Sequence, residues 1–229
     1  MSLDLYIFAG INGAGKSTLY SSAINPKIQA SKRANADEIA RDNHWDWHDQ
    51  KSNFKAMRIE VSRIHSFITN KQSFNMETTF ASSKKSYINI INEAKKQGFT
   101  THLLYVGLDS PELAKKRVKA RVAKGGHGIP DETIDRRYPK SIKNLTVLAP
   151  FFDTVEISDN TNEFTTIYTR NNDQVLIHNK EISWAQESIK EDISKLAERK
   201  VTLSQAELAA QYEAQKQQQK GLEQDGLEL

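Results

Sequence analysis

Eight consecutive residues near the start of the chain carry the strongest chemical signal. They match the pattern G-x-x-x-x-G-K-[ST] at every fixed position: Gly10-Ile11-Asn12-Gly13-Ala14-Gly15-Lys16-Ser17. The glycines allow positive φ, so that successive N–H groups point at phosphate oxygens, and the following helix presents its positive end to the same anions. Lys16 adds a charge beside the β- and γ-phosphates, and Ser17 offers its hydroxyl to Mg²⁺. The motif predicts a nucleotide site and leaves open whether the γ-phosphoryl group goes to a small molecule, a protein or water.

Polar side chains at the ends of two expected strands form a second signal. Asp37 stands where an extended segment turns into a helix, and Glu77 and Thr79 lie at the polar end of a strand over residues 73–80. Open α/β sheets present functional side chains at such places, where a carboxylate can meet a substrate or metal-bound water. The residues alone leave alternatives open, because Asp37 can instead cap the helix and the polar strand end can simply lead into the next helix.

Arginines and glycines form a third signal, in a predicted lid over residues 117–138. Arg117 and Arg121 lie four residues apart and therefore share one helical face, a glycine-rich bend follows, and Arg136 stands on the next helix. Such a lid can close over a nucleotide, exclude water and bring guanidinium groups to the transferring phosphoryl group. The alternative is a pair of solvated, charged helices.

Strands and helices alternate along the chain and must position these residues. Apolar runs predict buried strands over residues 5–9, 101–108 and 151–158, with amphipathic helices between the strands. Strand–helix–strand connections of this kind favour an α/β fold with a parallel, doubly wound sheet of about five strands.

The C-terminal part is expected to add a β-hairpin and a helix. Two short strands around a polar turn predict the hairpin over about 164–178. Helical propensity then runs from residue 183 to about 219, with a frayed, acidic end. We expect one P-loop domain over residues 1–199 and a polar helical tail over 200–229 that is partly disordered.

Composition excludes several classes of protein. The 229 residues carry a net charge of +3 with both signs interspersed, which gives no basic arm for nucleic acid. The chain has no cysteine, so disulfides, thiolate catalysis and Cys-based zinc sites are excluded. The first apolar run leads directly into the phosphate loop, as a core strand and not a signal peptide would, and no apolar stretch approaches the ~20 residues of a membrane span. We expect a soluble, cytoplasmic protein that binds neither nucleic acid nor a membrane.

Four blocks, in order over about residues 5–160, together resemble the zeta toxin family. They read Gly-Ile-Asn-Gly-Ala-Gly-Lys-Ser-Thr, Asn-Ala-Asp-Glu-Ile-Ala-Arg, Phe-Asn-Met-Glu-Thr-Thr and Arg-Val-x-x-Arg-Val-x-x-Gly-Gly-His-x-Ile-Pro. The resemblance implies a nucleotide-kinase-like P-loop NTPase fold, a parallel sheet flanked by helices, with ATP and Mg²⁺ as cofactors. Well-known members phosphorylate the 3′-hydroxyl of UDP-N-acetylglucosamine, which blocks cell-wall synthesis, and their usual partner is an epsilon antitoxin.

The resemblance also implies roles for individual residues. Asp37 matches the base that faces the sugar hydroxyl, Glu77 matches an acidic contact to the sugar with Thr79 beside it, and Arg121 resembles the first lid arginine. Lys16 would hold the transferring phosphate and Ser17 the metal. The residues expected to contact ATP are Asn12, Gly13, Ala14, Gly15, Lys16, Ser17, Thr18 and Arg117.

The sequence departs from the family pattern in the lid. His127 occupies roughly the place of the second lid arginine, so we assign that catalytic role to Arg136, with Arg137 as its substitute. The Gly-Gly-His lid and short length are closer to bacterial "predicted ATPase" relatives, whose acceptor does not follow from the resemblance. A nucleotide sugar is the expected acceptor. The alternatives are a kinase with a metabolic or antibiotic acceptor, and an ATP-switched binding module, which has no use for a base at Asp37.

Overall fold

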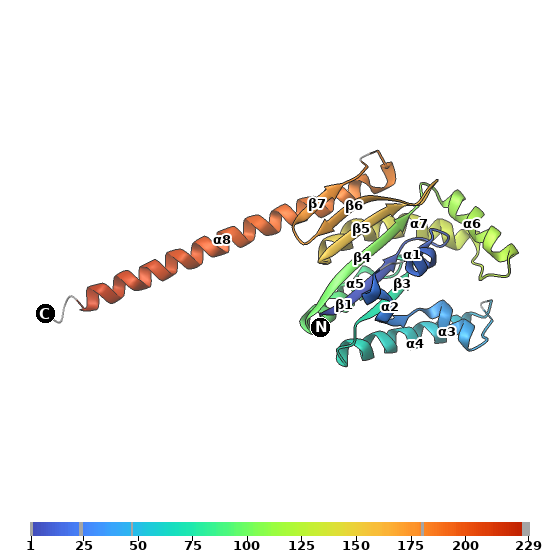
Figure 1. The fold of residues 1–229 in the computed structure, drawn as a ribbon, viewed down its shortest axis with the longest axis horizontal. Helices are drawn as coiled ribbons and strands as arrows, with labels where there is room; N and C mark the ends of the chain where they lie inside the picture. Colours follow the sequence, from blue (N-terminus) through green and yellow to red (C-terminus); the bar gives the residue numbers. More distant parts are fainter. Residues whose placement is uncertain (1, 23–24, 47, 180, 226–229) are drawn as a thin grey trace.

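A seven-stranded sheet in the order β2-β3-β1-β4-β5-β6-β7 forms the frame of the protein (Figure 1). The structure, a computed structural model, describes residues 2–22, 25–46, 48–179 and 181–225. The strands are β1 Leu3–Ala9, β2 Lys32–Ala34, β3 Phe74–Thr78, β4 Phe99–Gly107, β5 Thr154–Asp159, β6 Thr165–Asn171 and β7 Gln174–Ile177. The helices are α1 Lys16–Ser22, α2 Pro26–Ala30, α3 Ala36–Asp42, α4 Gln50–Thr69, α5 Lys84–Lys96, α6 Pro111–Ala123, α7 Asp131–Leu148 and α8 Gln186–Asp225.

The first five strands are parallel, and the last two form the appended hairpin. β1 pairs with β3 and β4, β2 with β3, and β4 with β5, all parallel, whereas β6 and β7 run antiparallel. The predicted parallel sheet of about five strands with a hairpin is therefore confirmed. Because parallel strands end at one edge, β1 delivers the phosphate loop beside the end of β3, with Phe8 in register with Glu77.

The central strand β1 buries both of its faces, as expected for a parallel strand covered by helices on each side. Leu5 and Ile7 join a large core with residues of α4, α5, α7 and the first turns of α8. Tyr6 and Phe8 point to the opposite face and pack with Ile28 of α2. The sheet is thus the middle layer, and it holds the loop after β1 between the two helical layers.

A buried ion pair joins the hairpin to the last helix. Arg170 on β6 contacts Asp192 on α8 with Nε–Oδ2 and Nη2–Oδ1 distances of 2.6 and 3.0 Å, and both residues are at most 2% exposed. Tyr168 donates a further hydrogen bond of 2.7 Å to Asp192. These bonds satisfy the buried carboxylate, as a buried charge requires.

The last helix leaves the domain and continues as one helix through Asp225 (Figure 1). It therefore extends past residues 215–220, where the sequence favours fraying, while the acidic end at 226–229 lies outside the described residues. The boundary expected near residue 199 remains a prediction. None of the helices in the described part of the chain combines the length and apolarity that crossing a membrane requires.

Candidate active site

The phosphate loop takes a shape that only glycine permits at three positions. Gly10, Gly13 and Gly15 have φ values of +138°, +81° and +106°. A Cβ on Gly10 would lie 2.1 Å from the carbonyl oxygen of Val106 and one on Gly13 2.8 Å from that of Ala114, closer than real Cβ contacts. The loop is thus pressed against β4 and α6, with its backbone left open toward the start of α1.

Lys16 at the start of α1 is buried, and its ammonium is held in place by the loop. Its Nζ donates to the carbonyl oxygen of Ile11 at 3.2 Å and lies 3.9 Å from Oε1 of Glu77. Burial lowers the pKa of Lys16, and the charges of Glu77 and Asp37 oppose that effect. The position next to the glycine-rich backbone is where the motif places a charge on the β- and γ-phosphates.

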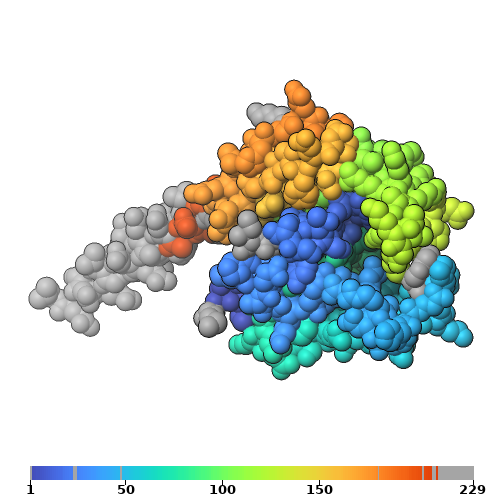
Figure 2. All heavy atoms as spheres, turned by 45° about the vertical axis from the view of Figure 1, so that its right-hand side comes forward, coloured from blue at the N-terminus to red at the C-terminus, as the bar shows by residue number. Residues whose placement is uncertain are grey.

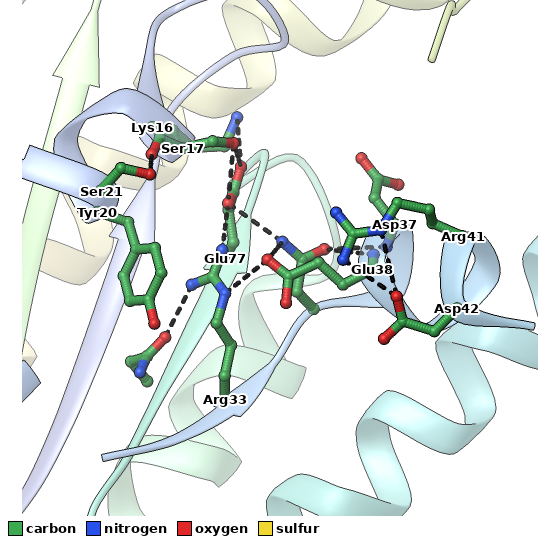
Figure 3. A network of polar contacts seen from close by, with 12 residues as sticks. Lys16, Ser17, Tyr20, Ser21, Arg33, Asp37, Glu38, Arg41, Asp42 and Glu77 are labelled. Carbon is green, nitrogen blue, oxygen red and sulfur yellow. Dashed lines mark hydrogen bonds and ion pairs between the residues drawn. The ribbon is translucent and has the colours of Figure 1, made fainter. Parts of the chain in front are cut away.

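Glu77, at the polar end of β3, is the centre of a hydrogen-bond network (Figure 3). Its carboxylate accepts from Ser17 Oγ at 3.0 and 3.2 Å, from Arg33 Nη2 at 2.9 Å and from Asn35 Nδ2 at 3.2 Å. Four chain segments therefore meet at one carboxylate: the end of β3, the start of α1, β2 and the start of α3. This network fixes the distance between the phosphate loop and α3.

Arg33 was missed by sequence reasoning, although it holds this network together. Besides Glu77 it binds Glu38 through Nε at 2.7 Å and Asn75 through Nη1 at 2.8 Å, and its guanidinium lies 3.7 Å from the ring centroid of Tyr20. A planar group with donors on several sides suits this arrangement, which a lysine could not reproduce. Its edge strand has three residues and gives almost no periodic signal.

Asn35, and not Asp37, caps helix α3. The Asn35 side chain accepts from the backbone N–H groups of Asp37 and Glu38 at 2.9 and 3.4 Å. Asp37 therefore lies in the first turn with an exposed carboxylate at the cleft, on the side of α3 that faces Lys16 and Arg121. The alternative in which Asp37 serves only as the cap is thus wrong.

Arg121 on α6 extends toward the phosphate loop with part of its guanidinium unpaired. Its Nε and Nη2 atoms are buried and have no hydrogen-bond partner. Buried donors without partners cost free energy, so this position is prepared for an anion. Arg117, one turn earlier, donates to the carbonyl oxygen of Thr161 at 3.1 Å, in the loop after β5.

The two candidates for the second lid arginine differ in their surroundings. Arg136 is exposed on α7, whereas Arg137 is partly buried and donates to Oδ1 of Asn12 in the phosphate loop at 3.2 Å. His127 lines the same cleft, but burial lowers its pKa, an effect that Asp37 opposes. Burial therefore favours the neutral imidazole of His127, whereas the guanidinium of Arg137 stays charged.

Several of the residues expected to contact ATP or the acceptor are not among those that line the cleft, namely Gly13, Ala14, Gly15, Thr18, Thr79 and Arg117. The residues that line it include Glu77 but not Thr79, whose backbone carbonyl accepts from Ser141 at 2.7 Å. Thr18 is exposed on α1, next to the lining residue Ser17. Ser141 and Asn144 of α7 donate hydrogen bonds to carbonyl groups of the loop after β3 and so fix this loop.

A cleft of about 780 Å³ joins these groups. Its lining includes Lys16, Ser17, Asp37, Glu77, Arg121 and His127. In Figure 2 the lid (green) and the region of α3 (light blue) face each other across this hollow.

Glu60 of α4 is a buried acid behind the cleft. Burial raises its pKa to about 7, and the negative charges of Asp37 and Glu77 add to the effect, while a hydrogen bond from the backbone of Ala36 opposes it. Its Oε1 is buried without a hydrogen-bond partner. The Glu60 carboxyl group therefore lies under the first turn of α3, beside Ala36, the residue before Asp37.

The residues present fit a magnesium nucleotide. The loop turns with positive φ at Gly13 and Gly15, Lys16 supplies a buried cation, and Arg121 supplies unpaired donors. Ser17 Oγ and the phosphate oxygens are hard oxygen ligands, which Mg²⁺ prefers with only one or two protein contacts.

The parallel sheet, the phosphate loop at the end of β1 and the arginine-bearing lid define a P-loop kinase, a class of phosphotransferase. A family model described as Zeta toxin matches residues 3–182. The chain therefore belongs to the zeta toxin family.

Several individual proteins are similar to parts of this chain. A Haemophilus influenzae protein (strain Rd) described as "Uncharacterized protein" is 34% identical over 134 residues, which are 57% of this chain and 89% of that protein. The AvrRxo1-ORF1:-ORF2 structure with ATP gives a TM-score of 0.63 at 15% identity over 81% of this chain, which spans only 64% of the matched chain. The PezAT toxin–antitoxin system of Streptococcus pneumoniae gives 0.54 at 14% identity, over 74% of this chain and 71% of that chain. At such identities the structural matches show the fold alone.

Proposed function

We propose that the protein is an ATP- and Mg²⁺-dependent kinase that transfers the γ-phosphoryl group to a hydroxyl of a small molecule. The observation that carries the proposal is the placement of an exposed carboxylate, Asp37, across one cleft from the buried Lys16 and the unpaired donors of Arg121. A protein that only hydrolyses or senses ATP needs the cations but has no use for a carboxylate presented to an acceptor.

The side chains divide the work of phosphoryl transfer, which is mainly positioning and charge stabilisation. Lys16 and the loop amides bind the β- and γ-phosphates, and Arg121 directs its free donors at the charge that develops on the transferring group. Arg137, which donates a hydrogen bond to Asn12, is the second arginine that we assign to charge stabilisation. Ser17 would hold Mg²⁺, which would supply charge neutralisation for the phosphates.

Asp37 orients the acceptor hydroxyl and accepts its proton as the new O–P bond forms. A carboxylate is a weak base toward an alcohol, so its contribution is alignment first and proton acceptance late in the reaction. The capping bond from Asn35 fixes the first turn of α3, and with it the position of Asp37. Glu77, held by Ser17 and Arg33, lines the same side of the cleft and completes the acceptor site.

For the acceptor we propose a nucleotide sugar such as UDP-N-acetylglucosamine, on the resemblance of the blocks around Asp37 and Glu77 to those of the family. The same resemblance supports a toxic effect in cells, a cytoplasmic location and neutralisation by an antitoxin protein. The AvrRxo1 and PezAT structures are complexes or systems of two proteins, which supports a protein partner here.

The test is turnover of ATP with Mg²⁺ by the purified protein, with and without UDP-N-acetylglucosamine, followed by the mass of the product. We expect the sugar to gain one phosphate, and Asp37→Asn to abolish this gain while ATP binding, measured by calorimetry, stays at the wild-type level. Hydrolysis that ignores every acceptor and survives Asp37→Asn would show that the protein is not a kinase. Phosphorylation of a different alcohol would keep the kinase and replace the acceptor.

A further inference from the structure

Trp184 forms a hydrogen bond with the nucleotide end of the sheet, although it lies outside residues 3–182, which match the family. It belongs to a short 3₁₀ turn, Ser183–Ala185, that leads into α8. Its indole Nε1 donates to Oδ1 of Asp159, the last residue of β5, at 2.8 Å. Asp159 is only 8% exposed, so its carboxylate depends on protein donors.

Asp159 holds the loop that follows β5. Its Oδ1 also accepts from Thr161 Oγ1 at 2.7 Å, and its Oδ2 accepts from the Thr161 backbone N–H at 3.1 Å. The carbonyl of Thr161 in turn accepts from Arg117 of the lid at 3.1 Å. Asn160, between the two, donates its side-chain amide to the carbonyl of Ala14 in the phosphate loop at 2.7 Å. One short loop therefore contacts both parts of the nucleotide site.

The indole ring cannot easily move away from Asp159. It lies directly over Gly107, where a Cβ would come within 2.1 Å of the ring, and its centroid is 5.9 Å from that of Tyr105. The first turns of α8 are fixed as well, because Ser188 bonds to Thr146 of α7 and Asp192 forms the buried ion pair with β6. Trp184 is thus fixed by the first turns of α8, and its indole N–H in turn fixes Asp159 and the loop after β5.

We propose that Trp184 is a positioning residue for ATP: its indole N–H fixes Asp159, which keeps Asn160 and Thr161 in place against the phosphate loop and Arg117. The proposal rests on the proposed function, in that ATP is the ligand. It adds that the segment after the family-matched region is part of the nucleotide site. The loop after β5 contacts the Ala14 carbonyl group of the phosphate loop and Arg117 of the lid but not Asp37, so the effect falls on nucleotide affinity and not on the chemical step.

The test compares two variants that each remove one buried donor to a carboxylate at the base of α8. Trp184→Phe keeps a ring over Gly107 but loses the N–H, and Tyr168→Phe loses the hydroxyl that donates to Asp192. We expect the Kd for ATP to rise about tenfold in Trp184→Phe, as the loss of a hydrogen bond to a charged group implies, with kcat at saturating ATP within about twofold of wild type. Tyr168→Phe should bind ATP like the wild type, even if both variants lose thermal stability.

A further variant tests the path from Trp184 to the loop. Thr161→Val removes the hydroxyl that shares Asp159 Oδ1, so it should weaken ATP binding, and the double variant with Trp184→Phe should be no weaker than the worse single variant. Wild-type affinity in Trp184→Phe, equal weakening in Tyr168→Phe, or additive losses in the double variant would each overturn the proposal.

Hydrogen exchange of the free protein separates this proposal from the proposed function. The Thr161 backbone N–H is bonded to Asp159, so a peptide over residues 159–162 should exchange faster in Trp184→Phe and at the wild-type rate in Tyr168→Phe. If the wild type fails to bind ATP, the proposed function fails, and this exchange result still decides whether Trp184 positions the loop.

Discussion

The hydroxyl of Ser17 donates to Glu77, with distances of 3.0 and 3.2 Å to the two carboxylate oxygens. The residue that the phosphate loop offers to a metal is therefore in direct contact with the residue at the end of β3. A hydroxyl has one proton and two lone pairs, so Ser17 can donate to Glu77 and still coordinate Mg²⁺. With its proton engaged, the Ser17 oxygen presents its lone pairs to the cation.

Glu77→Gln should weaken the Mg²⁺-dependent part of ATP binding. The amide can keep its oxygen toward Arg33 and turn its NH₂ toward Ser17, and it removes the negative charge that holds both groups. Calorimetry of ATP binding with Mg²⁺ and with EDTA should show a loss of about tenfold in the first condition and little change in the second. Glu38→Gln is the control, because Glu38 also binds Arg33 but has no bond to Ser17. Equal effects in both variants would assign the loss to Arg33.

Arg137→Ala should slow phosphoryl transfer, and Arg136→Ala should not. Arg137 donates to Asn12 in the phosphate loop, whereas its neighbour is exposed on α7. We expect kcat to fall about 100-fold or more in Arg137→Ala, as for loss of one charge-stabilising group, and to stay within twofold in Arg136→Ala. Steady-state measurements of kcat at saturating ATP decide between the two arginines. A large loss of kcat in Arg136→Ala, with little change in Arg137→Ala, would support Arg136 as the second lid arginine, as the sequence analysis expects.

Gly13→Ala should abolish nucleotide binding, whereas Gly98→Ala should only lower stability. Both glycines have similar positive φ, +81° and +87°, and so share a strain of about 1–2 kcal/mol on substitution. They differ in surroundings, because a Cβ on Gly13 meets the carbonyl of Ala114 at 2.8 Å, while a Cβ on Gly98 meets nothing within 4 Å. Denaturant unfolding with ATP titration separates the two effects. If Gly13→Ala binds ATP normally, the loop is less tightly pressed against α6 than the structure shows.

Glu60 should make the protein less stable as pH rises through the range from 4.5 to about 7. In this range the unfolded chain has released the Glu60 proton and the folded protein still holds it, so the free energy of unfolding falls with rising pH, by about 3 kcal/mol in total. Glu60→Gln stays neutral and removes this contribution. Urea unfolding at pH 5, 6, 7 and 8 should show the variant gaining on the wild type toward high pH. A constant difference in the free energy of unfolding between the two proteins would mean that the pKa of Glu60 in the folded state stays at its ordinary value of 4.5.

The features that local patterns determine were predictable. The phosphate loop, the parallel strands and the hairpin all follow from glycine spacing and apolar runs. The position of Asp37 and Glu77 at one edge of the sheet also follows, because parallel strands share that edge.

The features that local patterns could not decide depend on long-range partners or on helical phase. Arg33 finds Glu77 some 44 residues away, and no local signal marks it. Asn35 and Asp37 are both good capping residues, and only the start of α3 decides between them. Arg136 and Arg137 differ by one position, which on a helix of 3.6 residues per turn rotates a side chain by about 100°. A choice between neighbours therefore requires the packing of α7.

The 40 residues of α8 have a consequence for the behaviour of the protein in solution. At about 1.5 Å per residue the helix is about 60 Å long. If all 229 residues formed one compact body, its radius of gyration would be only about 17 Å, so the helix makes the protein much longer than a compact body of this mass. A particle with such a rod attached scatters, sediments and tumbles as an elongated body. It should elute from a sizing column ahead of globular proteins whose mass, measured by light scattering, is the same.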